Sequence, residues 1–306
     1  MYKELKKYGK VKLNELLSKH TTFKIGGPAD YFVIVNSTEN LIATLKIAEE
    51  NSIKYFILGG GSNILVSDEG FEGMVIKVNN NLMKIESDII IADAGCSTVQ
   101  VAQNSIKEKL TGFEWGVCIP GTIGGAVRGN AGAMGSEMKD LVEKVEALCG
   151  GEMVELNNKE CKFGYRDSVF KSNGVNIILR VHLKLKKGES KNLLAEALKH
   201  IQFRKNTQPS GFSSGCVFKN VSLEGFKGEA PKEFVKKGWI SAGWLIEKSG
   251  LKGEKIGDAQ ISEKHANFII NLGGAKARDV AQLIAEIKEK VYDRFGVNLE
   301  EEIHIV

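Results

Sequence analysis

The stretch GVCIPGTIGGAVRGNAGAMGSE, residues 116–137, decides the fold. Its glycines are too crowded for regular structure, and its other residues are too apolar for a disordered linker. Backbone that carries few side chains can lie flat against a large planar ligand or thread between the oxygens of a pyrophosphate. An irregular buried loop with unusual backbone angles is the alternative. The stretch therefore predicts a loop that binds a ligand.

A second glycine-rich segment, GGGSNILV, occupies residues 59–66 directly after an apolar strand. Consecutive glycines leave backbone N–H groups free to converge on an anion, and Ser62 and Asn63 add side-chain donors. A plain turn between strands explains this segment equally well. Neither loop has the Rossmann or P-loop spacing. Two such loops from adjacent domains nevertheless suggest a dinucleotide held in a cleft.

Composition indicates an ordinary globular protein of 306 residues with a net charge of +4. That charge suits an anionic small molecule but is too diffuse to predict nucleic-acid binding, which requires a basic stripe. The 5 cysteines lie far apart without a CxxC pair, which argues against disulfides and a metal site. The N-terminus has no apolar segment of signal-peptide length, and no apolar run approaches about 18 residues. We expect a reduced, cytoplasmic protein with no membrane or nucleic-acid partner.

Apolar spacing predicts helices and strands in an α+β arrangement of three parts. A strand at residues 31–36 precedes a helix that begins after Ser37, and residues 83–97 read as two strands with a turn at Ser87-Asp88. Long helices are expected at residues 192–205, with Leu194, Leu198 and Ile201 near one face, and at residues 277–295, ended by Gly296. The expected bounds of these parts are residues 1–78, 79–204 and 205–306.

These segments together resemble the UDP-N-acetylenolpyruvoylglucosamine reductase family. The resemblance rests on PGTIGGAVRGNAGAMG, on GGGSN, and on HTTFKIGGPAD at residues 20–30. It extends through GYRDSVFK, GCVFKN, AGWLIEKSGLKG, HANFIIN and the C-terminal FGVNLEEEIHIV, in the family's order. It implies an FAD-binding half of the vanillyl-alcohol-oxidase-like fold, with two FAD-binding subdomains at residues 1–78 and 79–204. Residues 205–306 would form a substrate-binding domain, and we leave open that the last residues return to the FAD half. The length is similar to that of the shorter, type II subgroup.

The resemblance implies that Arg166, in GYRDS, holds the enolpyruvyl carboxylate of the substrate and stabilises negative charge there. From the residues alone, a surface ion pair is the commoner role for such an arginine. A guanidinium is nonetheless the side chain best shaped for bidentate carboxylate binding. Tyr165 is expected to line the same pocket.

Glu302 is the glutamate that the resemblance implies for the active site, as the second acid of a Leu-Glu-x-Glu pattern that begins at Leu299. An acidic triplet at a C-terminus is more often a solvated surface. Which of Glu300, Glu301 and Glu302 faces the site stays open at this point.

Cys216, in GCVFKN, stands where much of the family carries a serine that donates a proton to the substrate. Thiol and hydroxyl each supply one donor at the same branch length. A free thiol has a pKa of about 8.5, far below that of a hydroxyl, so cysteine is the easier donor but its use depends on pH. The other cysteines lie in apolar or strand-like contexts, which favours structural roles for them.

The resemblance further implies bound FAD, with NADPH as reductant. The expected substrate residues are Tyr165, Lys219 and Asn220, whereas Trp244 and His265 are weaker candidates. The expected FAD-binding residues are Gly59, Gly60, Gly61, Ser62, Asn63, Pro120, Gly121, Thr122, Ile123, Gly124, Gly125, Asn130 and Ala131.

The implied activity is NADPH-dependent reduction of UDP-N-acetylglucosamine enolpyruvate to UDP-N-acetylmuramate for peptidoglycan, by a monomer or weak oligomer. Two alternatives stay open. One is an oxidase of the same flavin fold that uses oxygen and another substrate, although GYRDS, GCVFKN and the C-terminal glutamates argue against it. The other is a non-catalytic nucleotide-binding protein, which would stay colourless after incubation with FAD.

Overall fold

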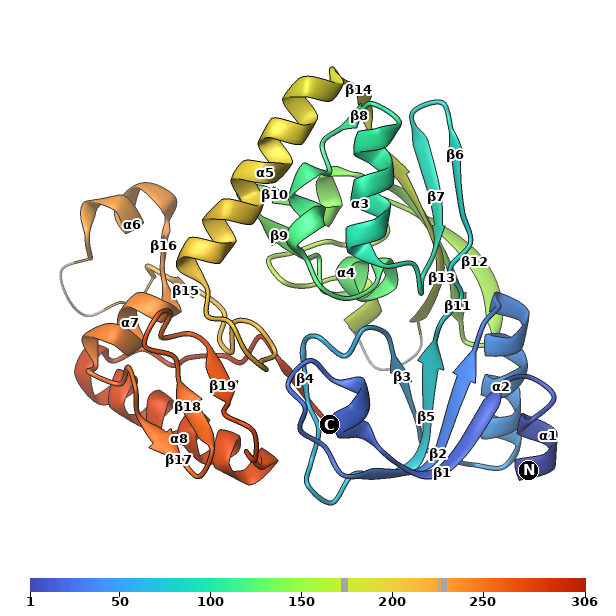
Figure 1. The fold of residues 1–306 in the computed structure, drawn as a ribbon, viewed down its shortest axis with the longest axis horizontal. Coiled ribbons are helices and arrows are strands. Elements are labelled where there is room, and N and C mark those ends of the chain that lie inside the picture. Colours follow the sequence, from blue (N-terminus) through green and yellow to red (C-terminus); the bar gives the residue numbers. More distant parts are fainter. Residues whose placement is uncertain (172–175, 225, 227–229) are drawn as a thin grey trace. The chain divides into compact units, whose positions relative to one another are not determined.

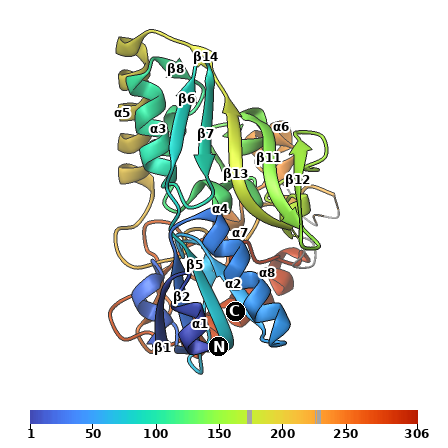
Figure 2. The same cartoon turned by 90° about the vertical axis from the view of Figure 1, so that its right-hand side faces the viewer.

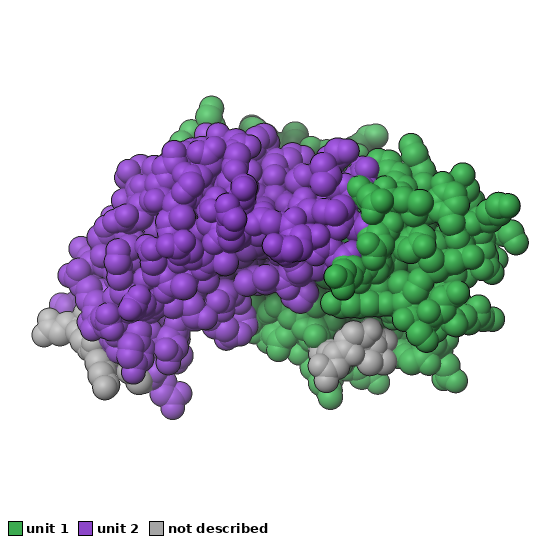
Figure 3. Space-filling view, turned by 90° about the horizontal axis from the view of Figure 1, so that it is seen from below, with its two compact units in different colours: residues 1–14, 30–60, 72–206 green, residues 15–29, 61–71, 207–306 purple. Residues whose placement is uncertain are grey.

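The computed structural model describes residues 1–171, 176–224, 226 and 230–306. The chain forms two compact units, each of which gathers segments that are distant in the sequence. Unit 1 comprises residues 1–14, 30–60 and 72–206, and unit 2 comprises residues 15–29, 61–71 and 207–306 (Figure 3). We describe each unit by itself.

A four-stranded sheet built mainly from unit 1 residues has the order β1-β2-β5-β3. The helix α2 (Thr38–Glu50) begins after Ser37, whose side-chain oxygen accepts a hydrogen bond from the N–H of Asn40. Its apolar residues join Val33 and Met74 of the sheet in one buried core. The remaining bounds are β1 (Lys10–Leu16), β2 (Pro28–Val35), β3 (Tyr55–Leu58), β5 (Phe71–Val78) and the short helix α1 (Tyr2–Leu5).

The second sheet of unit 1 is antiparallel throughout and has the order β12-β11-β13-β7-β6 (Figure 2). Ser87 has a positive φ of 57° in the tight turn that joins β6 to β7. The longest strand of this sheet does not alternate between core and solvent. It is buried on both faces, at residues 177–179 and 181–183. The strands are β6 (Met83–Glu86), β7 (Ile89–Asp93), β11 (Val142–Cys149), β12 (Glu152–Asn157) and β13 (Asn176–Lys184).

Helices cover part of this second sheet. The helix α3 (Thr98–Lys107) packs beside α5 (Ser190–Thr207), with Ile106 against Leu193 and Ala197 (Figure 1). The shorter elements of unit 1 are α4 (Ile123–Arg128), β8 (Leu110–Thr111), β9 (Gly132–Ala133), β10 (Ser136–Glu137), β14 (Lys186–Lys187) and the 3-10 turns η2 (Glu114–Cys118), η3 (Met138–Asp140) and η4 (Val169–Lys171).

The long helix α5 differs from expectation in the face that it buries. Leu194, Leu198 and Ile201 do share a face, but they are exposed, Leu198 by 64%. Leu193 and Ala197 make the contact with the rest of unit 1. The helix carries two apolar stripes about one residue apart, or roughly 100° around its axis, and its sequence pattern alone does not say which one packs.

Unit 2 is organised around the helix α8 (Ala277–Phe295), which ends at Gly296 in the left-handed conformation. The carboxylate of Asp68 accepts hydrogen bonds from the N–H groups of Ala277 and Arg278 at the start of this helix. The other elements are η1 (Leu17–His20), β4 (Ile64–Leu65), β15 (Val221–Ser222), α6 (Lys232–Lys237), β16 (Trp239–Ile240), α7 (Ala242–Lys248), β17 (Lys255–Ile256), β18 (Ala259–Ile261), β19 (Ile269–Asn271) and β20 (His304–Ile305).

The C-terminal strand β20 pairs in parallel with β4, which follows the triple glycine. One core joins Phe23, Leu65 and Phe218 to the apolar face of α8, so the early segments of the chain are integral to unit 2. No helix among the described residues is both long and apolar enough to cross a membrane. The mixture of helices and antiparallel strands confirms the predicted α+β class.

Candidate active site

The two glycine-rich loops meet inside unit 1. A Cβ atom placed on Gly60 would overlap the backbone of Gly121, and one on Gly59 would lie 2.6 Å from Oγ1 of Thr122. Such distances leave no room for a side chain, so glycine is required where the loops cross. The structure therefore brings together two segments that are distant in the sequence, as a shared ligand site requires.

The side chain of Lys77 holds the loop that begins at Gly59. Its Nζ donates a hydrogen bond to the carbonyl oxygen of Gly59. Burial lowers the pKa of the Lys77 ammonium, because the charged form loses solvation. This lysine stands in an apolar strand beside Leu58, and we did not predict a role for it. Its only signal in the sequence is one charge within GMVIKV.

Gly61, Ser62 and Asn63 belong to unit 2. The carbonyl oxygen of Gly61 accepts hydrogen bonds from the N–H and Oγ1 of Thr22, at 3.0 and 3.4 Å. The same Oγ1 donates to the carbonyl of Ser213 at 2.7 Å. Thr22 thus connects the triple glycine to the loop that leads to Cys216, a role that the sequence did not indicate.

The amides of this loop fit an anionic group. Within the described part of the chain, the N–H groups of Gly60 and Gly61 donate to no protein acceptor, whereas the carbonyls of Gly59 and Gly61 are bound. Successive free amides with their carbonyls turned to the protein are the donor set that binds phosphate oxygens. The loop therefore suits the pyrophosphate of a dinucleotide such as FAD.

The second loop has both buried and open positions. The N–H groups of Ile123 and Gly124 donate to the carbonyls of Cys96 and Ala94, so these residues bind to the protein itself. The side-chain oxygen of Thr122 caps the helix α4 by accepting a hydrogen bond from the N–H of Gly125. Gly125 itself is exposed. Among the predicted FAD-binding residues, Pro120, Gly121, Thr122 and Gly125 lie at the open part of the loop, while Ile123 and Gly124 face inward.

Asn130 is completely buried and has a positive φ of 40°. Its Nδ2 donates to the carbonyl of Gly164 at 2.7 Å and to Oε2 of Glu137 at 3.1 Å. Its Oδ1 accepts from the N–H of Lys139 at 2.9 Å. The next residue, Ala131, is half-buried and bonds through its backbone to Ala126. The Asn130 side chain is therefore turned to the protein.

Arg166 stands in a tight turn of unit 1. The backbone groups of Gly164 and Asp167 bond to each other at 3.0 and 3.3 Å, which leaves Tyr165 and Arg166 at the tip. Arg166 has a φ of 53°, a conformation that costs free energy for a residue other than glycine or asparagine. Its Nη2 donates to the carbonyl of Gly132 at 3.1 Å. A strained arginine held at a fixed place is the pattern expected of a binding residue.

Tyr165 shares this tip. Its ring is 47% exposed and lies 5.4 Å from the Cζ of Arg166. A guanidinium beside an aromatic ring is attracted to its π-system. Both side chains are therefore displayed from one turn, as the predicted carboxylate pocket requires.

Cys216 is half-buried in unit 2 and lies in a short extended segment. It pairs with Phe268, and the next residue, Val217, donates its N–H to the carbonyl of Asn267 at 2.8 Å. The Asn267 side chain also binds both backbone groups of Phe218, at 2.8 and 2.9 Å. The residues from 216 to 218 are thus fixed by the HANFIIN segment.

Glu302 lies beside this segment. Its N–H donates to the carbonyl of Val217 at 2.7 Å, and its own carbonyl accepts from Nδ2 of Asn63 at 3.0 Å. Unit 2 therefore gathers predicted residues from three distant segments, namely Asn63, Cys216 and Glu302. Arg166 and Tyr165 belong to unit 1.

The other two acids of the triplet are engaged in ion pairs. Glu300 binds Nζ of Lys219 at 2.5 Å, and Glu301 binds Nζ of Lys288 at 2.8 Å. Lys219 is therefore bound to Glu300 in this state. The role of Glu302 stays a prediction.

The remaining predicted residues support the fold as well. Oδ1 of Asn220 accepts from the N–H of Ala242 at 3.2 Å, at the start of α7. Burial lowers the pKa of His265, whose ring contacts Phe268 edge to face at 4.9 Å. Trp244 packs among Phe234 and Phe295. His265 and Trp244 therefore both make packing contacts within unit 2.

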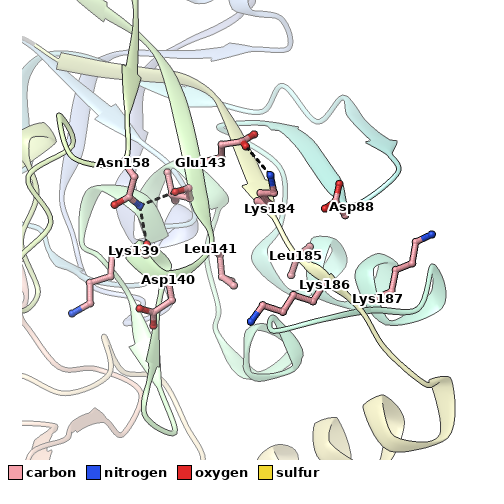
Figure 4. Close-up of a pocket in the computed structure, with 11 residues that line it drawn as sticks. Asp88, Lys139, Asp140, Leu141, Glu143, Asn158, Lys184, Leu185, Lys186 and Lys187 are labelled. Carbon is pink, nitrogen blue, oxygen red and sulfur yellow. Dashed lines mark hydrogen bonds and ion pairs between the residues drawn. The ribbon is translucent and has the colours of Figure 1, made fainter.

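A separate cavity of about 660 Å³ lies in unit 1 between the segment around Lys139 and the end of β13. Figure 4 shows that Asn158 donates to backbone carbonyls on one side of it, while Lys184 pairs with Glu143. Its lining contains none of the predicted site residues. Its charged side chains of both signs give it no preference for an anionic ligand, so we do not assign it to the flavin or the substrate.

Two family models match this chain. The model of the FAD binding domain matches residues 29–157, and that of the C-terminal domain of UDP-N-acetylenolpyruvoylglucosamine reductase matches residues 208–306. The reductase of Caldanaerobacter subterraneus subsp. tengcongensis is 42% identical over 99% of this chain and 96% of its own length. That of Bacillus subtilis is 37% identical over 97% and 94%.

The crystal structure of the reductase from Thermus caldophilus is similar over nearly the whole molecule. It covers 97% of this chain and 99% of its own, with a TM-score of 0.80 and 34% identity. Full-length identity of this level shows a common family. The chain therefore belongs to the UDP-N-acetylenolpyruvoylglucosamine reductase family and is a flavin-dependent oxidoreductase.

Proposed function

We propose that this protein reduces UDP-N-acetylglucosamine enolpyruvate to UDP-N-acetylmuramate with NADPH, in the synthesis of peptidoglycan precursors. The observation that carries the proposal is the 42% identity to a UDP-N-acetylenolpyruvoylglucosamine reductase across 99% of the chain. NADPH loses two electrons, and the enolpyruvyl double bond gains one hydride and one proton to become a lactyl ether. The balance needs no other reactant.

The backbone of Gly59, Gly60 and Gly61, with Ser62 and Asn63, would hold the pyrophosphate of FAD. The open residues of the second loop, Pro120, Gly121, Thr122 and Gly125, would also contact FAD. FAD, when bound, supplies the chemistry of hydride transfer. The free amides of Gly60 and Gly61 and the crossing of the loops support this assignment.

Arg166 would bind the carboxylate of the enolpyruvyl group. Negative charge grows on that carboxylate and the adjacent α-carbon as hydride reaches the β-carbon. A fixed guanidinium stabilises such charge at no cost of reorganisation during the reaction. Its hydrogen bond to Gly132 and its place at a tight turn support the assignment.

Cys216 would give the proton to the α-carbon, and Glu302 would stabilise the reacting groups electrostatically or through a bound proton. The position of Glu302 beside Val217 supports a joint role. Tyr165, Lys219 and Asn220 would bind the substrate. Because Lys219 pairs with Glu300, substrate phosphate would compete with that carboxylate for the lysine.

FAD and the substrate are assigned to different parts of the chain. We place FAD binding in residues 1–204 and substrate binding in residues 205–306, with a monomer or weak oligomer in the cytoplasm. The extent of the two family matches, 29–157 and 208–306, supports this division.

Anaerobic stopped-flow measurement of the two half-reactions tests the proposal. NADPH should bleach the flavin absorbance near 450 nm, and the enolpyruvyl ether should restore it in the absence of oxygen. A protein that stays reduced until oxygen is admitted would be an oxidase. A protein that remains colourless after incubation with FAD would refute a flavin enzyme altogether.

A further inference from the structure

Asn130 occupies a position where its side-chain amide can be oriented in only one way. One partner, the carbonyl of Gly164, must accept a hydrogen bond, and another, the N–H of Lys139, must donate one. The amide therefore directs Nδ2 to Gly164 and Oδ1 to Lys139. Its burial excludes water as a substitute partner. Each bond is thus difficult to replace.

The bond to Gly164 acts on the turn that presents Arg166. Gly164 and Asp167 close this turn through their backbone groups, and Arg166 inside it has a φ of 53°. The guanidinium in turn donates to Gly132, two residues after Asn130. The segment from 130 to 132 therefore binds the turn twice. Asn130 binds Gly164 at the base of the turn, and Gly132 binds the Arg166 side chain at its tip.

We propose that Asn130 is a positioning residue for Arg166. Its amide fixes the turn in the strained form that directs the guanidinium to the substrate, and so links the glycine-rich loop to carboxylate binding. This inference rests on the proposed function in one respect, the role of Arg166 as the carboxylate-binding residue. It assigns the Asn130 side chain to the protein, and the backbone N–H of this buried residue likewise donates to the carbonyl of Val127.

Asn130→Asp is the sharpest test. Aspartate has the same shape and tolerates a positive φ, but it directs a carboxylate oxygen at two acceptors, the Gly164 carbonyl and Glu137. The turn should shift. Because a displacement of about 1 Å can cost about 10²-fold in rate, we expect kcat/KM for the enolpyruvyl ether to fall about 10- to 100-fold. Flavin reduction by NADPH should change less than about 3-fold.

A double-mutant cycle with Arg166→Gln separates positioning from general damage. If Asn130 acts through Arg166, the Asp substitution should cost less than about 3-fold in the Arg166→Gln background, since coupled residues are not additive. Asn158→Asp is the matched control. It removes amide donors to Lys139 and Val142 on the neighbouring segment but has no bond to the turn. It should leave the kinetics with the enolpyruvyl ether within about 2-fold of wild type.

Additive losses, equal losses in both half-reactions, or an equal loss in Asn158→Asp would overturn the inference. If Asn130→Asp binds no FAD, Asn130→Gly repeats the test, because glycine accepts the backbone conformation. Failure of both variants to bind FAD would also count against it, because the residue would then support the whole loop.

Failure of the proposed function is recognised separately, as a wild-type protein whose reduced flavin does not react with the enolpyruvyl ether. In that case, a crystal structure of Asn130→Asp tests whether Asn130 positions Arg166. A turn in which Arg166 has left the Gly132 carbonyl supports the positioning role, and an unmoved Arg166 overturns it.

Discussion

Gly60 and Gly121 lie backbone against backbone where the two glycine-rich loops cross in unit 1. A Cβ on Gly60 would overlap the Cα of Gly121. Neither partner is a flexible side chain that could move aside, so the loops themselves would have to separate. The crossing thus explains why both loops are rich in glycine.

Gly60→Ala should therefore lose FAD and stability together. Overpacking of this kind costs about 1–3 kcal/mol, and the displaced loop no longer presents its amides. The ratio of absorbance at 450 nm to that at 280 nm, together with urea unfolding, measures both effects. Gly129→Ala is the control, because its Cβ would lie 3.6 Å from the carbonyl of Gly125. A coloured, stable Gly60→Ala protein would show that the loops do not cross.

Lys77 should give the protein a pH dependence in the alkaline range. Burial lowers its pKa from 10.5, so between the two values the folded state binds fewer protons than the unfolded chain. The free energy of unfolding should consequently rise with pH in this interval. Lys77→Met should lose this rise. Urea unfolding from pH 8 to 10.5 compares the two proteins, and parallel curves would contradict a perturbed lysine.

Local sequence patterns predicted the elements that depend on neighbouring residues. The helix after Ser37, the turn at Ser87 and the end of α8 at Gly296 follow from capping, turn chemistry and periodicity. The sequence did not predict which face of α5 is buried. The buried stripe with Leu193 and the exposed stripe with Leu194 both fit the helical period.

The sequence also indicated candidate site residues without their supporting contacts. The bonds of Lys77 to Gly59 and of Thr22 to Ser213 join segments that are far apart, so no local pattern contains them. The positive φ of Arg166 was likewise not predicted from the sequence. The ion pairs of Glu300 with Lys219 and of Glu301 with Lys288 are also absent from any local pattern.

Substitution of the C-terminal acids should separate them clearly. Glu302→Gln should lower the rate of the reaction with the enolpyruvyl ether about 10²-fold, the scale of one lost electrostatic contact in a transition state. Glu301→Gln should lose its ion pair with Lys288 and change stability by less than about 1 kcal/mol. Stopped-flow rates of both variants provide the comparison. A larger kinetic loss in Glu301→Gln would shift the assignment by one residue.

Alkylation should distinguish Cys216 from the other thiols. Burial raises the pKa of Cys96 and Cys161 to about 11 and also raises those of Cys118 and Cys149, so these four thiols react poorly at neutral pH. Iodoacetamide should inactivate the wild type, with the enolpyruvyl ether protecting it. Cys216→Ser should keep much of its activity and resist the reagent. Full activity after stoichiometric modification of Cys216 would exclude its role as proton donor.

The most direct test of the account follows the two half-reactions of Cys216→Ala in anaerobic stopped flow. The account predicts flavin reduction by NADPH at nearly the wild-type rate and reoxidation by UDP-N-acetylglucosamine enolpyruvate slowed about 10²- to 10⁴-fold, the range for a lost general acid. Equal slowing of both half-reactions, or unchanged reoxidation, would contradict it.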